Sequence, residues 1–597
     1  MQNDIPHMHK TTKVTRLFDF PYYQLENYPQ EKCFISKEKN KWINVSTQKY
    51  IEDANAVSKS LLKLGIKPGD KIAVITSNNQ PKWNILDIGV MQIGAVNVPL
   101  YPTFSEKDYA YILNHSDSVY YFVSDDELYQ KVIAVKDKTQ LKNVFTFKEI
   151  ETDYDWNSFL ALGKNIDNQS IVDENKKLVK STDLATIIYT SGTTGTPKGV
   201  MLSHHNIATN IFAVGKTLDL HDKNKKAISY LPICHIFERT ASYYCQYMGF
   251  EIHFAESIDK IGDNLREVQP NFMAVVPRLL EKVFDKIVDK GNNLNGIKKQ
   301  LFFWALNLGE NYKPYKQNGS WYEFKLKIAR KLVFSKWQEA LGGELNFMLA
   351  GSAPMQPRLI KVFTAAGIPV FEGYGMTETS PAVSVTDMRN NGFKIGTVGR
   401  AIENVTIKIA DDGEILVKGP NIMMGYYKNT EKTNETIKNG YLHTGDIGEI
   451  DNEGFFKITD RKKEIFKTSG GKYIAPAVLE SELKKSRFIE QVMVIGESEK
   501  MPAALIQVSF DFVYEWAKRH NHIINNISTD EKLIVRIQKE IDYYNKKFGK
   551  WEQIKRFEIT PDEWTVENNH LTPTLKMRRK IILEKYNELY KKIYNSQ

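Results

Sequence analysis

Short apolar runs alternate with amphipathic stretches through the first three quarters of the chain. The runs are rich in β-branched and aromatic residues, which favours strands. They cover residues 71–76, 119–124, 184–190, 272–276 and 347–351. Between several of them the apolar positions recur with helical spacing, as over residues 47–65. Buried strands that alternate with helices are typical of α/β folds with largely parallel sheets, and we predict such a fold here.

The pattern changes in the last third of the chain. Residues 405–419 predict a hairpin that turns at Asp412-Gly413, and residues 448–458 predict another. Together they indicate a β-rich subdomain at about 395–458. The segment that follows, 459–476, combines dense charge with small residues, which suits a hinge. We therefore predict an N-terminal domain over 1–459 and a smaller α+β domain over 460–597.

Residues 285–345 form a segment of different character, since they are aromatic, basic and helical in pattern. Two interpretations stay open at this stage. The segment is either a membrane-facing or lid insertion, or a set of ordinary packed helices whose aromatic residues belong to a core.

Composition narrows the class of protein. A chain of 597 residues is too long for one core, so two or more domains are expected. The net charge of +9 is modest for this length. The basic residues are dispersed and no recognition motif is present, which argues against a nucleic-acid partner. The basic tail, 575–597, is either a solvated helix face or a contact for an anionic surface.

Cysteine usage and hydropathy indicate the compartment. Three cysteines without a CxxC pair argue against a disulfide framework and a zinc site, and they fit a reducing compartment. The first residues contain no apolar core of a signal peptide, and no run of 18 apolar residues occurs. We therefore predict a cytoplasmic protein without a transmembrane helix.

Residues 189–200, "YTSGTTGTPKGV", predict a phosphate-binding loop between a buried strand and a helix capped by Ser203. Glycines let successive N–H groups point at one place, hydroxyls add donors, and Lys198 adds a positive charge. The loop is not a Walker A loop, because Pro197 and Gly199 stand at two of the positions that define that motif.

This loop resembles the signature loop of the adenylate-forming enzymes, which include acyl-CoA synthetases, luciferases and peptide-synthetase adenylation domains. Further motifs follow in the family's order across essentially the whole chain: "LAGSAP" (349–354), "FEGYGMTETSP" (371–381), "YLHTGDIG" (441–448) and "LTPTLKMRR" (571–579). The resemblance implies a large N-terminal domain of two parallel-type sheets with helices plus the β-rich subdomain. It also implies a smaller, mobile C-terminal domain.

The resemblance implies ATP, Mg²⁺ and coenzyme A as ligands. The implied nucleotide contacts are Thr190, Ser191, Gly192, Thr193, Thr194, Gly195, Gly351, Ser352, Ala353, Glu372, Gly373, Tyr374 and Gly375. Tyr374 would stack on adenine and Thr377 would contact the α-phosphate. Glu378, with Thr193, would hold Mg²⁺, an ion that prefers hard oxygen ligands. Asp446 and Arg461 would contact the ribose, with an Asx turn as the alternative for Asp446.

The remaining implied residues belong to the second half-reaction and to the acyl site. Lys463 occupies the pivot of the hinge, with Asp460 close by. Lys467 matches a lysine associated with the thioester-forming conformation in relatives, and the loop of Ser469, Gly470 and Gly471 resembles the one that approaches coenzyme A. "LPICHIFER" (231–239) resembles the long-chain form of a motif that puts His235 near the carboxylate, although a structural histidine stays open. The implied catalytic set is Lys576, Lys198, Thr377, Glu378 and His235.

The resemblance therefore predicts an ATP-dependent long-chain fatty acid–CoA ligase that works through acyl-AMP. A medium-chain or aromatic acid–CoA ligase is an alternative. An acyl-AMP ligase serving a carrier protein is another, but residues 459–476 lack the insertion of those relatives, which favours coenzyme A. An inactive lipid-binding scaffold is a third. Peripheral contact with the inner face of the membrane and a homodimeric state are left open.

Overall fold

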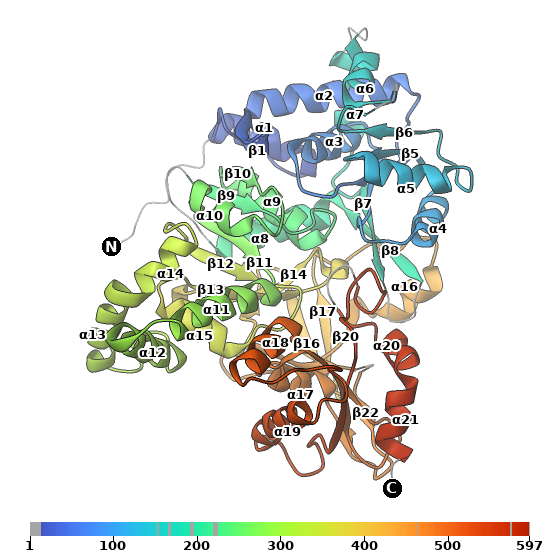
Figure 1. Cartoon of the computed structure of the whole chain (residues 1–597). Coiled ribbons are helices and arrows are strands. Elements are labelled where there is room, and N and C mark those ends of the chain that lie inside the picture. Colours follow the sequence, from blue (N-terminus) through green and yellow to red (C-terminus); the bar gives the residue numbers. More distant parts are fainter. Residues whose placement is uncertain are drawn as a thin grey trace. The chain divides into compact units, whose positions relative to one another are not determined.

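The chain divides into two compact units (Figure 1). Unit 1 comprises Met1–Ile407, Val417–Leu442 and Asn452–Phe456, and unit 2 comprises Lys408–Leu416, His443–Asp451 and Lys457–Gln597. The computed structural model describes residues 13–150, 152, 154–164, 169–191, 196–218, 225–462, 464–572 and 576–595. None of the helices in these ranges combines the length and the apolar character that crossing a bilayer requires.

A seven-stranded sheet in unit 1 has the order β18-β8-β7-β4-β3-β5-β6. From β7 to β6 the neighbouring strands are parallel, whereas β8 is antiparallel to β7. The strands are β3 (Lys71–Ile75), β4 (Val96–Pro99), β5 (Ser118–Val123), β6 (Asn143–Thr146), β7 (Leu184–Ser191), β8 (Pro197–Ser203) and β18 (Gly425–Tyr426). Three predicted apolar runs are thus strands β3, β5 and β7.

A nine-stranded sheet in unit 1 has the order β15-β14-β13-β12-β11-β9-β10-β1-β2. Its strands are β1 (Phe34–Glu38), β2 (Lys41–Val45), β9 (Lys226–Ser229), β10 (Glu251–Phe254), β11 (Phe272–Val275), β12 (Phe347–Ala350), β13 (Val370–Gly375), β14 (Ala382–Val385) and β15 (Arg400–Ala401). From β1 to β13 the neighbours are parallel, which confirms the predicted parallel character. The carboxyl ends of β11, β12 and β13 meet at one edge, where α/β sheets bind ligands.

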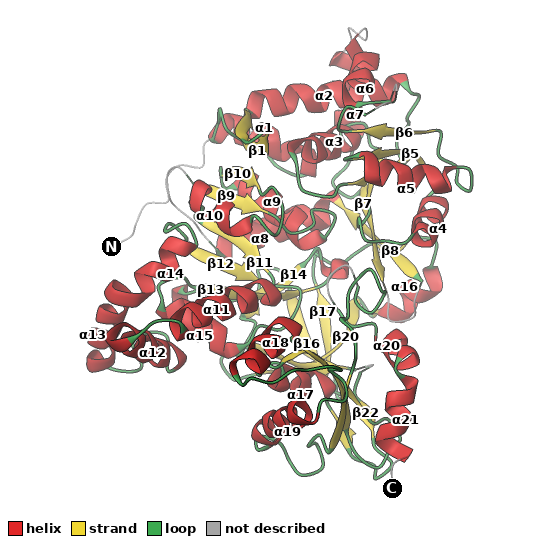
Figure 2. Cartoon of the chain, in the orientation of Figure 1, coloured by secondary structure: helices red, strands yellow, loops and turns green. Residues whose placement is uncertain are grey.

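Helices pack against these sheets (Figure 2). Helix α2 lies within the stretch 47–65 that the sequence predicted, and Ser46 caps it by accepting the Lys49 N–H. The first helices are α1 (Phe20–Asn27), α2 (Thr47–Lys63), α3 (Pro81–Met91), α4 (Glu106–Ser116), α5 (Asp126–Lys136), α6 (Trp156–Lys164), α7 (Gln169–Leu178), α8 (His204–Thr217), α9 (Ile236–Tyr247) and α10 (Ile261–Val268). Helix α16 (Thr430–Thr436) follows late in the chain.

The aromatic segment 285–345 is helical, as predicted. It contains the end of α11 (Pro277–Asn292), then α12 (Gly296–Glu310), α13 (Ser320–Ala329), a π-helical turn (Arg330–Phe334) and α14 (Ser335–Ala340). Helix α15 (Pro357–Ala365) packs on α12. The inward side chains Phe302, Leu326 and Trp337 are buried, so this side of the segment is an ordinary helical core.

The β-rich subdomain contains a sheet of order β16-β17-β20-β19, with β21 beside β20. These strands are β16 (Thr406–Ile409), β17 (Glu414–Lys418), β19 (Ile437–Lys438), β20 (Tyr441–Ile450) and β21 (Phe456–Arg461). The hairpin of β16 and β17 turns at Asp412-Gly413 as predicted. Gly413 has a φ of +84°, a conformation that side chains other than glycine rarely adopt.

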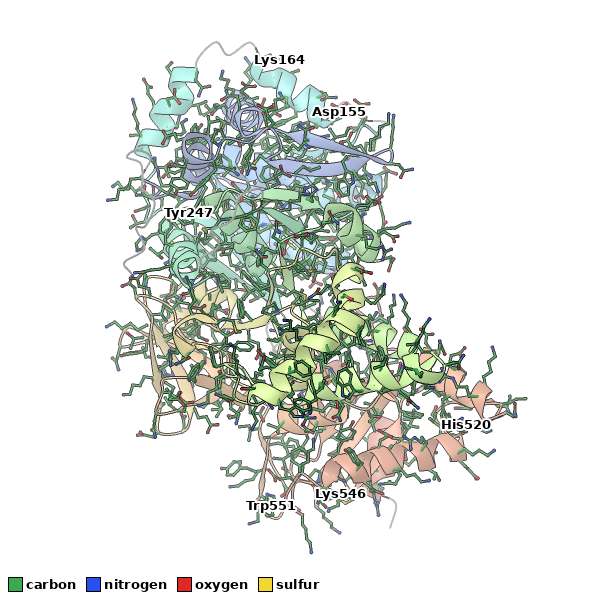
Figure 3. All side chains as sticks on the ribbon, turned by 90° about the vertical axis from the view of Figure 1, so that its left-hand side faces the viewer. Asp155, Lys164, Tyr247, His520, Lys546 and Trp551 are labelled. Carbon is green, nitrogen blue, oxygen red and sulfur yellow. The ribbon has the colours of Figure 1, made fainter. Side chains whose placement is uncertain are left out.

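The rest of unit 2 is an α+β arrangement around a three-stranded sheet of order β24-β25-β26, beside the small ribbon β22-β23. The strands are β22 (Phe466–Lys467), β23 (Tyr473–Ile474), β24 (Ile489–Ile495), β25 (Ala503–Val508) and β26 (Arg556–Ile559). The helices are α17 (Pro476–Leu483), α18 (Phe510–Arg519), α19 (Glu531–Asn545), α20 (Arg579–Lys585) and α21 (Asn587–Asn595). In Figure 3, His520 and Lys546 mark the ends of α18 and α19.

Candidate functional site

Two paired strands, β7 and β8, flank the predicted phosphate loop. Strands β7 and β8 pair from Leu184 opposite Ser203 to Ser191 opposite Pro197. The expectation of a helix directly after the loop was wrong, because residues 197–203 pair with a buried strand that satisfies their backbone groups. Helix α8 begins only at His204, and Ser203 caps it as predicted. The loop residues Gly192, Thr193, Thr194 and Gly195 lie outside the described residues.

Close packing shapes this hairpin beside Lys198. A Cβ on Gly199 would lie 2.8 Å from Ile187 Cγ2 and 3.1 Å from Tyr189 Cζ, so only glycine fits. Thr190 lies opposite Lys198 in the register. The Lys198 Nζ lies 5.8 Å from the centre of the Tyr426 ring, within the range of a cation–π attraction. The loop's positive charge is therefore held in place by a neighbouring strand.

The segment 375–381 forms a rigid turn after β13. Thr377 and Glu378 lie in a short 3₁₀ helix (Thr377–Thr379), and each is only 8% exposed. A Cβ on Gly375 would lie 1.8 Å from the Pro381 carbonyl oxygen, which makes glycine obligatory. Asn421 donates hydrogen bonds of 3.0 Å to the carbonyl oxygens on both sides of Pro381, those of residues 379 and 382. The turn therefore presents Glu378 in one orientation.

Tyr426 connects the two predicted phosphate-side residues. Its hydroxyl donates a 2.8 Å hydrogen bond to Glu378 Oε1, while its ring faces Lys198. Burial and the Glu378 carboxylate raise the pKa of Tyr426 well above its usual range, so it stays a donor. The sequence analysis missed this residue. Its only signal was the aromatic pair "GYY", and the pairing of β18 with β8 brings it to the hairpin.

The predicted adenine contacts gather at the carboxyl edge of the nine-stranded sheet. Residues 351–353 follow β12 directly, and Ala350 lies opposite Glu372 of β13. Gly373 and Gly375 flank Tyr374 on the same strand. The Tyr374 ring meets Phe456 edge-on with 5.4 Å between centres. Burial raises the pKa of Glu372 to about 8, while a hydrogen bond from the Met355 backbone opposes this rise.

His235 has a structural function in this fold. Its Nδ1 accepts the Phe237 N–H at 3.2 Å and so caps the N-terminus of α9. The imidazole also meets Tyr101 edge-on, with ring centres 6.4 Å apart. The structural role that the sequence left open is therefore present, and a catalytic role for His235 stays a prediction.

Unit 2 brings together the two predicted ribose contacts. Arg461 Nε lies 3.4 Å from Asp446 Oδ1, so the pair offers a carboxylate and a guanidinium side by side. Beside them, Lys462 Nζ forms ion pairs of 2.6 Å with Asp412 and 2.8 Å with Glu414. This network joins the end of β21 to the hairpin of β16 and β17 within the unit.

The predicted hinge and coenzyme A residues follow in unit 2. Lys463 lies outside the described residues. The neighbouring Asp460 is buried, which raises the pKa of its carboxyl to about 6. Lys467 lies at the end of β22 with its Nζ 4.9 Å from the centre of the Tyr473 ring. The exposed residues 469–471 form the turn between β22 and β23.

Lys576 lies in unit 2 at the start of the last described range, 576–595. Its N–H donates a 3.0 Å hydrogen bond to Thr572 Oγ1, and Leu571 pairs with Met577. Three residues later, Arg579 forms ion pairs with Glu464 and with the buried Glu480. The segment that begins at Lys576 is thus tied, through Arg579, to Glu464 just after the predicted pivot.

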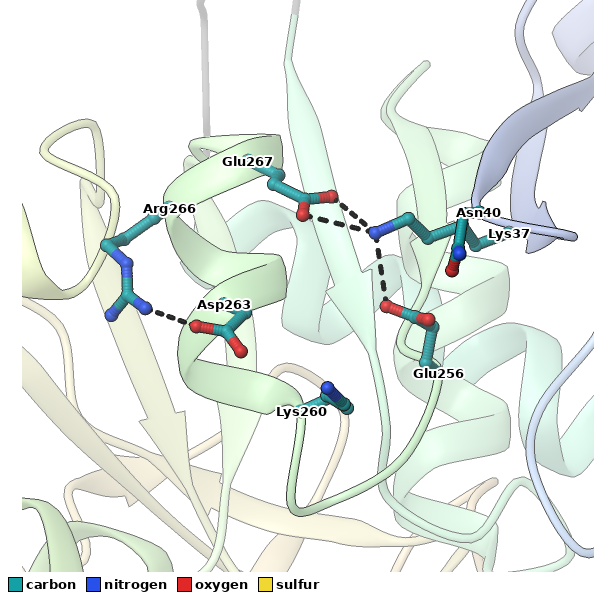
Figure 4. A pocket seen from close by; sticks show the side chains of 7 residues that line it. All are labelled: Lys37, Asn40, Glu256, Lys260, Asp263, Arg266 and Glu267. Atoms are coloured by element: carbon teal, nitrogen blue, oxygen red, sulfur yellow. Dashed lines mark hydrogen bonds and ion pairs between the residues drawn. The ribbon is translucent and has the colours of Figure 1, made fainter.

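A shallow hollow on unit 1 is unrelated to these residues (Figure 4). It has a volume of about 340 Å³ and is lined by Lys37, Asn40, Glu256, Lys260, Asp263, Arg266 and Glu267. Lys37 Nζ bonds Glu267 at 2.9 Å and Glu256 at 3.2 Å. All of its lining residues are polar or charged, so the hollow offers no apolar wall for an acyl chain.

The donor groups fit one hard cation rather than a metal cluster. Within the described ranges, no three His, Cys, Asp or Glu side chains gather as a metal site would require. Glu378 is a single buried carboxylate. Mg²⁺ usually takes one or two carboxylates and completes its shell with water and phosphate oxygens, so Glu378 suits it.

Comparison with known proteins gives the class to which this geometry belongs. The chain is a member of the AMP-binding enzyme family: the family's main domain matches residues 22–427, and the AMP-binding enzyme C-terminal domain matches residues 463–597. One relative is the long-chain-fatty-acid–CoA ligase FadD15 from Mycobacterium bovis. It is 32% identical to this chain over 571 residues, which are 93% of each chain.

Solved structures share the fold. The adenylation domain of a carboxylate reductase from *Mycobacterium chelonae* has a TM-score of 0.76 at 21% identity, covering 98% of this chain and 92% of that one. The O-succinylbenzoate coenzyme A synthetase of *Bacillus subtilis*, in complex with ATP and magnesium ion, has a TM-score of 0.65 at 19% identity. That match covers 94% of this chain and 98% of the synthetase chain. The predicted α/β fold, with a large N-terminal and a smaller C-terminal domain, is confirmed.

Proposed function

We propose that this AMP-binding enzyme joins a long-chain fatty acid to coenzyme A at the expense of ATP. The arrangement that carries the adenylation step is the one around Tyr426, which holds the carboxylate of Glu378 and faces Lys198. Support for the acyl-CoA product comes from the 32% identity to a long-chain-fatty-acid–CoA ligase along 93% of the chain.

The reaction has two steps. A fatty carboxylate oxygen attacks the α-phosphorus of ATP, the bond to the β-phosphate oxygen breaks, and pyrophosphate leaves with acyl-AMP as the product. The coenzyme A thiol then loses its proton, its sulfur attacks the acyl carbon, and AMP leaves. Negative charge moves onto phosphate oxygens in the first step, where positioned donors and cations stabilise it.

The phosphate-side roles follow from the chemistry of each side chain. Lys198, Lys576 and the N–H and hydroxyl groups of Thr193 and Thr194 stabilise the phosphate oxygens, and Thr377 binds the α-phosphate. Glu378, with Thr193, holds Mg²⁺, which neutralises phosphate charge when bound. Support for ATP and Mg²⁺ as ligands comes from the Bacillus subtilis synthetase of the same fold, whose structure is a complex with ATP and magnesium ion.

The remaining roles concern the nucleoside and the second step. Asp446 accepts hydrogen bonds from the ribose hydroxyls, with Arg461 beside it. Lys463 is the pivot at a domain boundary near residues 459 and 460. Rotation of the C-terminal domain about this pivot moves Lys576 away before the thiol arrives. Lys467 and residues 469–471 bind coenzyme A.

The substrate also bears on location. Long-chain fatty acids partition into bilayers, so a cytoplasmic protein with peripheral contact at the inner face of the membrane fits this function. The long-chain preference is supported by the motif at 231–239 and by the relative's name. The proposal leaves the oligomeric state open.

The test is a product assay on the purified protein with ATP, Mg²⁺, coenzyme A and fatty acids of graded length. Acyl-CoA and AMP in equal amounts, largest for the long chains, are the expected result by mass spectrometry. Acyl-AMP without acyl-CoA would move the protein to the carrier-dependent ligases. Best turnover with short or aromatic acids would overturn the long-chain assignment, and no turnover with any acid would overturn the proposal.

A further inference from the structure

Helix α13 carries a row of large apolar side chains on its outer face. Trp321 is 69% exposed, Phe324 55%, Ile328 37% and Leu332, in the π-helical turn that follows, 52%. The intervals of three, four and four residues put these side chains on one side of the helix. Trp321 and Phe324 stack with 5.5 Å between ring centres. Single exposed apolar residues are ordinary, but four in one row form a patch that requires an explanation.

The opposite face of the same helix is packed against the rest of unit 1. Leu326 and Ala329 are buried, and the hydroxyl of the buried Tyr322 donates a 2.6 Å hydrogen bond to the Leu308 carbonyl oxygen on α12. Figure 1 shows α12 and α13 at the margin of unit 1. The patch is therefore presented by a helix that is already held in place.

Positive charges flank the apolar row. Lys325 lies on one side of it, with its Nζ 5.7 Å from the centre of the Trp321 ring, and Lys327 and Lys331 lie on the other. Lys327 and Lys331 are exposed. Around them, residues 296–340 contain nine basic and three acidic residues. The segment 296–340 is thus much more positive, for its length, than the chain as a whole.

This combination matches the interface of an anionic bilayer. A helix that lies in a membrane surface buries an apolar face with Trp and Phe among the acyl chains, while flanking lysines reach the anionic headgroups. A second copy of the chain fits less well, because a face-to-face pair would bring the lysines of both copies together. We propose that the row Trp321, Phe324, Ile328 and Leu332, with its flanking lysines, binds the surface of an anionic lipid bilayer.

The proposal gives a location to the membrane contact that the fatty substrate suggests, and it can be tested without the ligase reaction. The full-length protein is sedimented with vesicles of phosphatidylcholine, with or without phosphatidylglycerol. The wild-type protein should bind the anionic vesicles, more weakly at high salt. Trp321→Ala/Phe324→Ala should lower the binding constant at least about tenfold, since it removes the inserted side chains.

A second pair of variants separates this patch from general charge. Lys327→Glu/Lys331→Glu should weaken binding by about 25-fold or more, at about fivefold per lysine. Lys63→Glu/Lys107→Glu changes the net charge equally at exposed positions on α2 and α4, and should bind nearly as the wild type does. Trp551→Ala removes a tryptophan that is 55% exposed in unit 2 and serves as the apolar control.

Three outcomes would overturn the proposal. The first is a wild-type protein that does not sediment with anionic vesicles. The second is a loss of binding in the two control variants equal to that in the two patch variants. The third is unchanged vesicle binding of Trp321→Ala/Phe324→Ala together with dissociation of a dimer in analytical ultracentrifugation, which would make the row an interface between copies. Acyl-CoA formation from a detergent-dispersed fatty acid should persist in every variant, so failure of the ligase assignment is distinguished from failure of this one.

Discussion

Arg239 offers a sharp test of what holds unit 1 together, since its charge is completely buried. Its exposed fraction is 0% and that of Asp87 is 1%. Arg239 Nη2 lies 2.6 Å from Asp87 Oδ1, and Nε lies 3.1 Å from Oδ2. Arg239 Nη1 also donates a 2.7 Å hydrogen bond to Thr186 Oγ1 on β7. The guanidinium thus joins α9, α3 and the strand that leads to the phosphate loop.

The substitution Arg239→Met removes the positive charge and keeps an apolar side chain. Asp87 would retain hydrogen bonds from Asn97, at 2.7 Å, and from Tyr243, at 2.6 Å, but it would lose both bonds from arginine. Breaking a buried pair from one side typically costs about 3–5 kcal/mol, because the remaining charge is left uncompensated. We expect a loss of this size in the free energy of unfolding.

The matched control is an ion pair of similar length at the surface. Lys49 Nζ lies 2.7 Å from Asp53 Oδ1, with the lysine side chain 58% exposed. Lys49→Met should cost about 0–1 kcal/mol, as exposed pairs do. The measurement is urea unfolding followed by circular dichroism, comparing the transition midpoints of the two variants with the wild type.

A double variant checks the cause. In Arg239→Met/Asp87→Asn no unpaired charge remains, so part of the lost stability should return. The reasoning is refuted if Arg239→Met is no more destabilising than Lys49→Met, or if the double variant is less stable than Arg239→Met alone.

Three further predictions concern the candidate site. Lys198→Ala should slow acyl-AMP formation roughly 10²–10³-fold without unfolding the chain, measured as pyrophosphate release in a single turnover; an effect below about threefold would contradict its role. Tyr426→Phe removes the hydrogen bond to Glu378 and should raise the Mg²⁺ concentration for half-maximal activity about tenfold, and an unchanged Mg²⁺ requirement would refute the positioning role. Burial raises the pKa of Glu372 from 4.5 to about 8, so between these pH values the folded chain holds a proton that the unfolded chain has lost. The free energy of unfolding therefore falls as pH rises through this range, by at most about 1.4 kcal/mol per pH unit. Between about pH 5 and 8, the urea midpoint of Glu372→Gln should fall less than that of the wild type, because the variant has no carboxyl to titrate. Equal falls in the variant and the wild type would contradict this prediction.

Local patterns were enough to predict much of the framework. The apolar runs at 71–76 and 347–351 became strands β3 and β12, because a short apolar run bounded by turn residues favours a buried strand. Ser203 caps α8, and Asp412-Gly413 turns its hairpin, since both depend on a few neighbouring residues. The motif order also identified the family, which the comparisons confirm.

The tertiary structure alone decided what depends on partners distant in the chain. Residues 197–203 form a strand because β7 supplies a pairing edge, which their local pattern did not reveal. Tyr426 reaches Glu378 only through the pairing of β18 with β8, across more than two hundred residues. Packing on α12 buries one face of α13 in the segment 285–345 and leaves the row that begins at Trp321 exposed, so the packed helical core is confirmed while contact with a membrane stays a prediction. Amphipathic spacing defines the two faces of a helix, but only the neighbours present in the fold determine which face is covered.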